Sequence, residues 1–96
     1  MAYAVKLAFN VLRPTDEDFV KQLKENGNPS MTRNHDVFLF PCDNLAAAQR
    51  MELSFINWAG EADRLDEVDA YCVESEQRWI AVPNPEADKL REMYQS

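Results

Sequence analysis

Residues 3–12 read YAVKLAFNVL, and the alternation in this segment determines the predicted fold class. The apolar side chains of Val5, Leu7, Phe9 and Val11 fall on one face of an extended chain, and smaller or polar residues fall on the other. A period of two is typical of a β-strand that buries one face. The sequence therefore predicts an opening strand here, whose apolar face the rest of the chain must cover.

Two helices are predicted from their start and stop signals. The first covers about residues 16–26, with Thr15 as its N-cap, acids in its first turn and Gly27 just beyond its end. The last begins with Asn84 as a cap and Pro85 at the first helical position, and it runs toward the C-terminus.

A further helix lies between them. Either Asp43 or Asn44 caps it. Its apolar stripe repeats at helical spacing and consists of Ala47, Met51, Phe55 and Trp58. Gly60 marks the point near residue 60 where this helix either ends or bends, and the sequence leaves both possibilities open.

Three more strands complete the predicted order β-α-β-α-β-β-α. They are Val37–Phe40, ended by Pro41, and the pair Val68–Val73 and Arg78–Val82, whose four-residue connection favours an antiparallel hairpin. Residues 28–36 are predicted to be a polar loop. The expected fold is α+β, with a single mostly antiparallel sheet of about four strands and helices packed on one face. Residues 1–96 are expected to form a single domain.

The composition restricts the classes of partner. Seventeen acids and ten bases give a formal net charge of −7. Nucleic-acid phosphates and anionic lipids repel such a chain, so direct binding to nucleic acid or to a membrane is not expected. No apolar run reaches the length of a membrane span. The expected partner is a basic surface, including that of a protein complex that itself binds nucleic acid.

Cysteine usage and the N-terminus predict a cytoplasmic location. Cys42 and Cys72 lack the spacing of a redox motif, and we interpret both as reduced thiols, with one disulfide as the alternative. The N-terminal segment alternates around Lys6 and has no cleavage site of small residues, which excludes an ordinary signal peptide.

The residues that carry common chemistries are sparse. His35 stands alone in a polar stretch, and Cys42 follows a proline without a patterned histidine. One histidine and two distant cysteines give no recognisable zinc site, and two distant glycines give no phosphate loop. We therefore expect no catalytic residue, no metal and no cofactor. A small enzyme that uses Cys42 or His35 is the weakest alternative.

One segment carries nearly all of the charge imbalance. Residues 61–76 contain seven acids and one base, Arg64, so seven minus one leaves −6 of the total −7. The acids are Glu61, Asp63, Asp66, Glu67, Asp69, Glu74 and Glu76. On a strand, Glu67 and Asp69 would project from one side about 7 Å apart, like neighbouring phosphates. A solubilising surface is the alternative, although concentrated like charge costs folding free energy that dispersed charge would not.

The whole chain resembles small phage-encoded anti-CRISPR proteins, in particular the type I-F group that act as DNA mimics. Residues 4–20, AVKLAFNVLRPTDEDFV, and residues 61–69, EADRLDEVD, carry the resemblance, which rests on no signature motif. It implies a non-enzymatic inhibitor whose acidic face occupies the basic site where a crRNA-guided surveillance complex grips target DNA. Tyr71 would then add an apolar anchor beside the acids.

A second hypothesis comes from a different functional class. The opening strand and the apolar run of residues 37–40 could leave an apolar sheet face through which the chain associates as an assembly or subunit module. That function predicts a stable oligomer and little sensitivity to salt, whereas an acidic mimic predicts strong sensitivity.

Overall fold

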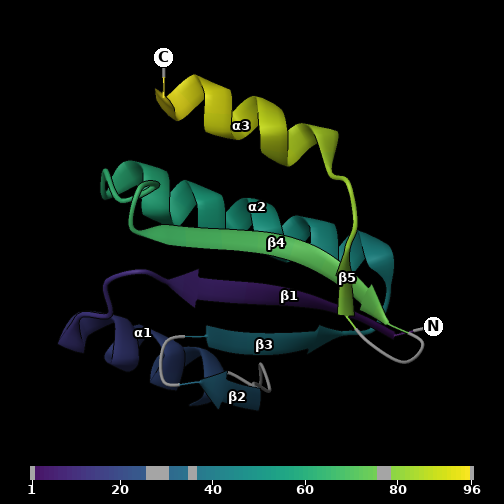
Figure 1. Cartoon of the computed structure of the whole chain (residues 1–96), viewed down its shortest axis with the longest axis horizontal. Coiled ribbons are helices and arrows are strands. Elements are labelled where there is room, and N and C mark those ends of the chain that lie inside the picture. Colours follow the sequence, from purple (N-terminus) through teal and green to yellow (C-terminus); the bar gives the residue numbers. More distant parts are fainter. Residues whose placement is uncertain (1, 26–30, 35–36, 76–78, 96) are drawn as a thin grey trace.

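A computed structural model describes residues 2–25, 31–34, 37–75 and 79–95. The α+β class is confirmed: one antiparallel sheet carries the predicted strands together with one additional short strand, and three helices accompany it (Figure 1). The strands are β1 (Ala2–Phe9), β2 (Met31–Asn34), β3 (Val37–Cys42), β4 (Val68–Ser75) and β5 (Trp79–Ala81). The helices are α1 (Pro14–Glu25), α2 (Leu45–Glu61) and α3 (Pro85–Gln95). The sheet order is β2-β3-β1-β4-β5.

The additional strand, β2, lies within the segment that the sequence predicted to be a loop. Met31 pairs with Leu39 and Thr32 pairs with Phe38, and a register shift follows between Thr32 and Asn34. The segment is polar because β2 is a short edge strand, where polar residues and bulges are the usual means of discouraging further pairing. Hydrophobic periodicity therefore gave no signal for it.

Pro41 does not end β3, which was a second error of the sequence interpretation. It lies inside the strand, opposite Ala4 of β1. The Asn10 N–H donates to the Glu67 carbonyl of the neighbouring chain segment that leads into β4. Backbone groups alternate in direction along a strand, so every second residue before Asn10, including Ala4, also turns its N–H and C=O toward β4. Ala4 and Pro41 therefore form a non-hydrogen-bonded pair. The nitrogen of Pro41 therefore points away from β1. On that side of β3, the pairing with β2 ends at Leu39, so the missing N–H of Pro41 costs no hydrogen bond of the sheet.

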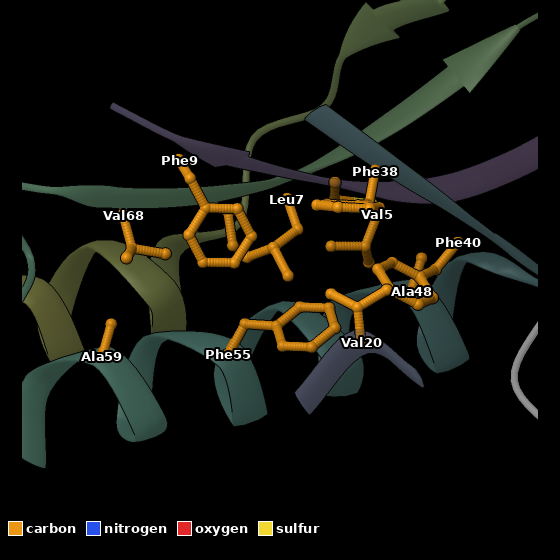
Figure 2. Close-up of a cluster of buried hydrophobic side chains, with 12 residues drawn as sticks. Val5, Leu7, Phe9, Val20, Phe38, Phe40, Ala48, Phe55, Ala59 and Val68 are labelled. Atoms are coloured by element: carbon orange, nitrogen blue, oxygen red, sulfur yellow. The ribbon is translucent and has the colours of Figure 1, made fainter. Parts of the chain in front are cut away.

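The core lies between the sheet and the helices α1 and α2 (Figure 2). Val5, Leu7 and Phe9 of β1 are buried there as predicted, but β1 ends at Phe9 and Val11 is 50% exposed. Across this core, Phe19 of α1 stacks on Trp58 of α2 with ring centroids 4.4 Å apart. The two helices therefore cover the same sheet face, as the sequence predicted.

The caps of two helices can now be assigned. Asn44 caps α2, because its Oδ1 accepts a hydrogen bond from the Ala47 N–H at 2.8 Å. Thr15 was predicted to be the N-cap of α1, but the helix already begins at Pro14, so Thr15 is a helical residue. The carboxylate of Asp16 accepts a hydrogen bond from the Arg13 N–H at 2.9 Å, which is one half of a capping box.

Helix α3 packs against α2 rather than on the sheet. The two helices approach closely at Gly60, where an added Cβ would stand 2.5 Å from the ring of Tyr94. The Tyr94 hydroxyl donates to Asn57 Oδ1 at 2.9 Å. Gly60 is therefore required for the contact between the two helices, not for ending α2.

A buried carboxylate, Glu52, joins α2, β4 and the start of α3. It is 2% exposed and accepts hydrogen bonds from the Cys72 N–H and from Asn84 Nδ2, each at 2.7 Å. Burial raises the pKa of Glu52 above its ordinary value, although both hydrogen bonds favour the ionised form. The carboxylate satisfies a backbone N–H that β5 does not reach.

Replacing Glu52 with Gln should change the pH dependence of stability. A raised folded-state pKa means that the stabilising contribution of Glu52 is complete below the unfolded pKa and is lost as pH rises through the folded pKa. Glu52→Gln should therefore gain stability relative to the wild type as pH rises above the unfolded pKa, near 4.5, as measured by urea unfolding. Glu52→Ala should cost about 2–3 kcal/mol, because it leaves the Cys72 N–H unsatisfied. If the stability difference between Glu52→Gln and the wild type did not change with pH, Glu52 would not have a raised pKa in the folded protein.

Candidate functional site

The end of α2 is a Schellman turn with an aspartate in its left-handed position. The Arg64 N–H donates to the Ala59 carbonyl at 2.8 Å, and the Asp63 N–H donates to the Gly60 carbonyl at 3.1 Å. Asp63 has φ 56°, a conformation that glycine usually supplies. This turn answers the question that the sequence left open: α2 ends, and it ends through Asp63.

Three exposed acids gather around this turn, and we call them the acidic end: Glu61, Asp63 and Asp66. Within the described parts of the chain, none of the three has an ion-pair partner. The end of α2, the start of β4 and the C-terminal end of α3 lie at one side of the molecule, on the left in Figure 1. The acidic end is therefore an unneutralised patch on one end of the fold.

The position of these acids is unfavourable for folding in three ways. The C-terminal end of a helix carries partial negative charge, so Glu61 and Asp63 oppose the dipole of α2. The last turn of α2 contains no basic residue. Asp63 also occupies a left-handed conformation, and the three carboxylates repel one another. A surface that needed only solubility could carry the same charge elsewhere at a lower cost.

Glu67, which the sequence grouped with these acids, is ion-paired and is not part of the acidic end. Its carboxylate binds Arg13 Nη2 at 2.6 Å and Arg64 Nε at 2.9 Å. These two arginines hold its carboxylate, so it forms no row of unpaired acids with Asp69. The two arginines hold the pKa of Glu67 below its ordinary value.

Behind Glu67 lies a buried ion pair that ties α1 to the end of α2. Arg64 Nη1 is 2.5 Å from Asp16 Oδ1, and the two side chains are 7% and 0% exposed. Hydrogen bonds from Arg64 hold the pKa of Asp16 below its ordinary value. The guanidinium of Arg64 also lies over the ring of Trp58. The single base of the acidic segment therefore has a structural role.

The other predicted residues are dispersed. The side chain of Asp69, in β4, is 64% exposed, and its Oδ1 lies 3.6 Å from Arg91 Nη2 of α3. Tyr71 is half-buried beside Lys6 of β1. Glu74 is half-buried near the far end of β4, and Glu76 lies outside the described residues. The structure therefore gathers the acidic end with Asp69 nearby, and it separates Glu67 and Glu74 from them.

Two adjoining hollows flank the acidic end. One, of about 330 Å³, is lined by Gly60, Asp63, Leu65, Asp66, Tyr94 and Gln95. The other, of about 600 Å³, lies among α2, β4, β5 and α3. Leu65 and Gln95 line both. Sequence reasoning missed the contribution of Tyr94 and Gln95, because only the docking of α3 on α2 brings the C-terminal turn to this place.

The residues considered for catalysis gain no support from their surroundings. Cys42 and Cys72 are free thiols; burial raises the pKa of Cys42, and it raises that of Cys72 to about 11. Neither is therefore activated as a thiolate. His35 lies outside the described residues. Among the residues that the structure does describe, no group of three or more potential ligands could hold a metal ion.

Comparisons with known proteins add no information about this site. No protein-family model matches the chain, and neither the curated proteins nor the solved structures give a match. In the described part of the chain, no helix has the length and apolar character needed to cross a membrane.

Asp63→Gly should separate stability from function at this site. Glycine adopts the left-handed conformation freely and removes one repulsive charge, so the free energy of unfolding should rise by about 0.5–1 kcal/mol. Chemical denaturation measures that gain. If the acidic end binds a partner, the same variant should bind it more weakly. A loss of stability would show that Asp63 makes favourable contacts that outweigh its strain.

Proposed function

We propose that this chain is a non-enzymatic inhibitor that binds the basic surface of a nucleic-acid-binding protein complex through the acidic end. The observation that carries the proposal is the placement of Glu61, Asp63 and Asp66. These three exposed acids have no ion-pair partner among the residues that the structure describes, and the helix dipole, the backbone and their mutual repulsion all disfavour their position. Functional sites are where proteins retain such local costs.

The chemistry of the patch specifies the kind of partner. A cluster of carboxylates attracts lysine and arginine side chains and repels phosphates, so the partner is a basic protein rather than nucleic acid or anionic lipid. Lysines and arginines that hold DNA phosphates can hold carboxylates in the same way. The acidic end therefore competes with nucleic acid for one set of cations.

We further propose that the complex is a type I-F crRNA-guided surveillance complex and that the chain is an anti-CRISPR protein of the DNA-mimic kind. The resemblance of residues 4–20 and 61–69 to such proteins supports this narrower identity. The acidic end supplies the negative charge that a DNA mimic requires.

A gel-shift experiment tests the proposal. Purified type I-F surveillance complex is mixed with labelled target DNA, with and without this chain, across a series of salt concentrations. Near-equimolar chain should abolish the DNA shift at low salt. The inhibition should weaken as salt rises, because screening weakens contacts between exposed charges. An unchanged DNA shift at every salt concentration would overturn the narrower identity.

The alternative, an assembly module with an apolar sheet face, has less support. Phe38 and Phe40 lie in the core, and Leu39 on the opposite face is 3% exposed. Among the described residues, the exposed large apolar side chains are Val11, Ile80 and Met93, and none belongs to β1 or β3. A salt-insensitive oligomer in sedimentation experiments would favour that module over an acidic inhibitor.

A further inference from the structure

Helix α3 is docked on the rest of the fold with little apolar burial. It lies at the upper margin of the molecule in Figure 1, and α2 is the only described helix or strand against which its backbone packs. Ala87 is its only buried residue, and Met93 is 60% exposed. Burial of an apolar face is what usually holds a helix in a protein, so this source of stability is small for α3.

The packing beneath α3 is also incomplete. The hollow of about 600 Å³ among α2, β4, β5 and α3 is lined by Ile56 of α2 and by Arg91 and Gln95 of α3. Asp69 lines it as well and is 64% exposed at its side chain, so the hollow reaches the solvent. Side chains that border such a space make fewer packing contacts than those of a filled core.

Hydrogen bonds at three points along α3 supply the main attachment to the rest of the protein. They run from Asn84 Nδ2 to Glu52 Oε2 at 2.7 Å, from Arg91 Nη2 to the Ala70 carbonyl at 2.5 Å, and from the Tyr94 hydroxyl to Asn57 Oδ1 at 2.9 Å. A single bond of this kind changes an equilibrium only about two- to tenfold. The three together therefore hold α3 far less firmly than a packed core would.

The chain can release α3 without disturbing the sheet. Val82 is fixed to the sheet, because its N–H donates to the Cys72 carbonyl at 2.9 Å. Asn84 already takes part in the docking of α3, so the exposed Pro83 between them is the pivot. A helix of 11 residues is not stable by itself in water, so α3 unfolds when it leaves.

Release of α3 uncovers one stripe of α2. Glu52, Ile56 and Gly60 follow one another at intervals of four, which places them on one face of that helix. Glu52 binds Asn84 and Gly60 contacts Tyr94, so this face is the one that α3 covers. Ile56 is 2% exposed but belongs to neither core cluster, which agrees with a cover that comes from α3.

Glu52 couples the release of α3 to pH. Its carboxylate faces Cys72 of β4 and the charged Asp88 and Arg91 of α3, and burial raises its pKa despite the attraction of Arg91. When α3 leaves, water reaches the carboxylate and its pKa returns toward the ordinary value of 4.5. The stabilising contribution to docking is therefore complete below about pH 4.5 and is lost as pH rises through the raised pKa of the docked form.

We infer that α3 is a strap that leaves the fold as one unit, pivots at Pro83 and is released more readily as pH rises. In the released state, Glu52, Ile56 and the Ala70 carbonyl are open to solvent. The inference does not depend on the proposed function, because none of the three hydrogen bonds that attach α3 involves the acidic end.

Native-state hydrogen exchange followed by NMR tests the inference. The backbone amides of Lys89, Leu90 and Met93 in α3 should share one protection factor. That factor should be at least about tenfold below those of Val5 and Leu7 in β1, which exchange only when the whole protein unfolds.

Two substitutions separate release of α3 from global unfolding. Tyr94→Phe removes one attachment and should speed exchange at Lys89 and Met93 by the same factor, about two- to tenfold. Val20→Ala weakens the core beneath α1, away from α3. It should speed exchange at Val5 about fivefold or more and leave the α3 amides within about twofold of the wild type.

The same amides report the pH dependence. After correction for intrinsic exchange rates, the protection of Lys89 and Leu90 should fall in the wild type between about pH 5 and about pH 7. In Glu52→Gln, which has no carboxylate to ionise, their protection should stay constant over that range.

Four results would overturn the inference. Equal protection of α3 and β1, or equal acceleration of both by Val20→Ala, would mean that α3 opens only with the whole protein. An effect of Tyr94→Phe that fades toward Lys89 would mean that the last turn frays while the rest stays docked. A pH dependence that persists in Glu52→Gln would mean that Glu52 does not control the release.

Discussion

Arg64→Ala should lower the free energy of unfolding by about 3–5 kcal/mol, the largest effect expected of any single substitution in this protein. The guanidinium joins two carboxylates, Asp16 on α1 and Glu67 before β4. Removing it leaves the carboxylate of Asp16, which is 0% exposed, without its main partner. Urea unfolding at pH 7 measures the loss.

Two comparisons isolate the cause of this loss. Arg13 also binds Glu67, but its side chain is 51% exposed, so Arg13→Ala should cost less than about 1 kcal/mol. Replacing both buried partners, as Asp16→Asn with Arg64→Met, should cost less than Arg64→Ala alone, because no buried charge is left unpaired. A loss below about 1 kcal/mol for Arg64→Ala would show that water reaches Asp16 and that the pair does not hold α1 in place.

The pH dependence of stability follows from the same pair. Arg64 lowers the folded-state pKa of Asp16, so the stability that Asp16 contributes is present above its unfolded pKa, near 3.8, and is lost as pH falls through the lower folded pKa. This sign is opposite to that of Glu52. Acid unfolding of the wild type should therefore include this loss below about pH 4, and Arg64→Ala should show a smaller one.

Reversing the charge of the acidic end should abolish partner binding while leaving the fold intact. The triple variant Glu61→Lys, Asp63→Lys and Asp66→Lys should bind the surveillance complex at least about a hundredfold more weakly, because three attractive contacts become repulsive. All three residues are exposed, and the new lysines complement the dipole of α2, which offsets the cost of placing a lysine in the left-handed conformation of position 63, so stability should stay within about 1 kcal/mol of the wild type. Titration calorimetry measures the affinity, and circular dichroism checks the fold.

A matched control distinguishes this patch from net charge. Glu17→Lys, Asp18→Lys and Glu86→Lys change the total charge equally, on exposed residues near the N-terminal ends of α1 and α3. That control should retain binding within about fivefold, since only long-range attraction is reduced. Equal weakening by both triple variants would mean that the total charge, rather than the acidic end, determines binding.

Much of the fold could be predicted because local patterns and tertiary packing agree. The alternation of β1 and the stripe through Phe55 and Trp58 describe residues that the core buries. Asn84-Pro85 favours the start of a helix through local backbone preference, and α3 does begin at Pro85. The strand β2 and the position of Pro41 could not be predicted in this way, because both depend on which edge of β3 is paired.

The site was predicted less well, because counting charges along the chain cannot show how each charge is paired. Glu67 was grouped with its sequence neighbours, but its partner Arg13 lies 54 residues away. Asp63 was one acid among seven until the backbone placed it in a left-handed turn. Asp and Asn tolerate the left-handed conformation, so an Asp just past the end of a helix could have suggested such a turn, but no sequence signal places Gln95 beside it.

The proposal that the acidic end takes the place of DNA is tested most directly by mutual exclusion. Fluorescently labelled chain is bound to the type I-F surveillance complex, and unlabelled target DNA is then titrated in at low salt. We predict complete release of the chain, with an apparent Kd for the chain that rises in proportion to the DNA concentration. A stable assembly containing complex, chain and saturating DNA together would contradict the proposal.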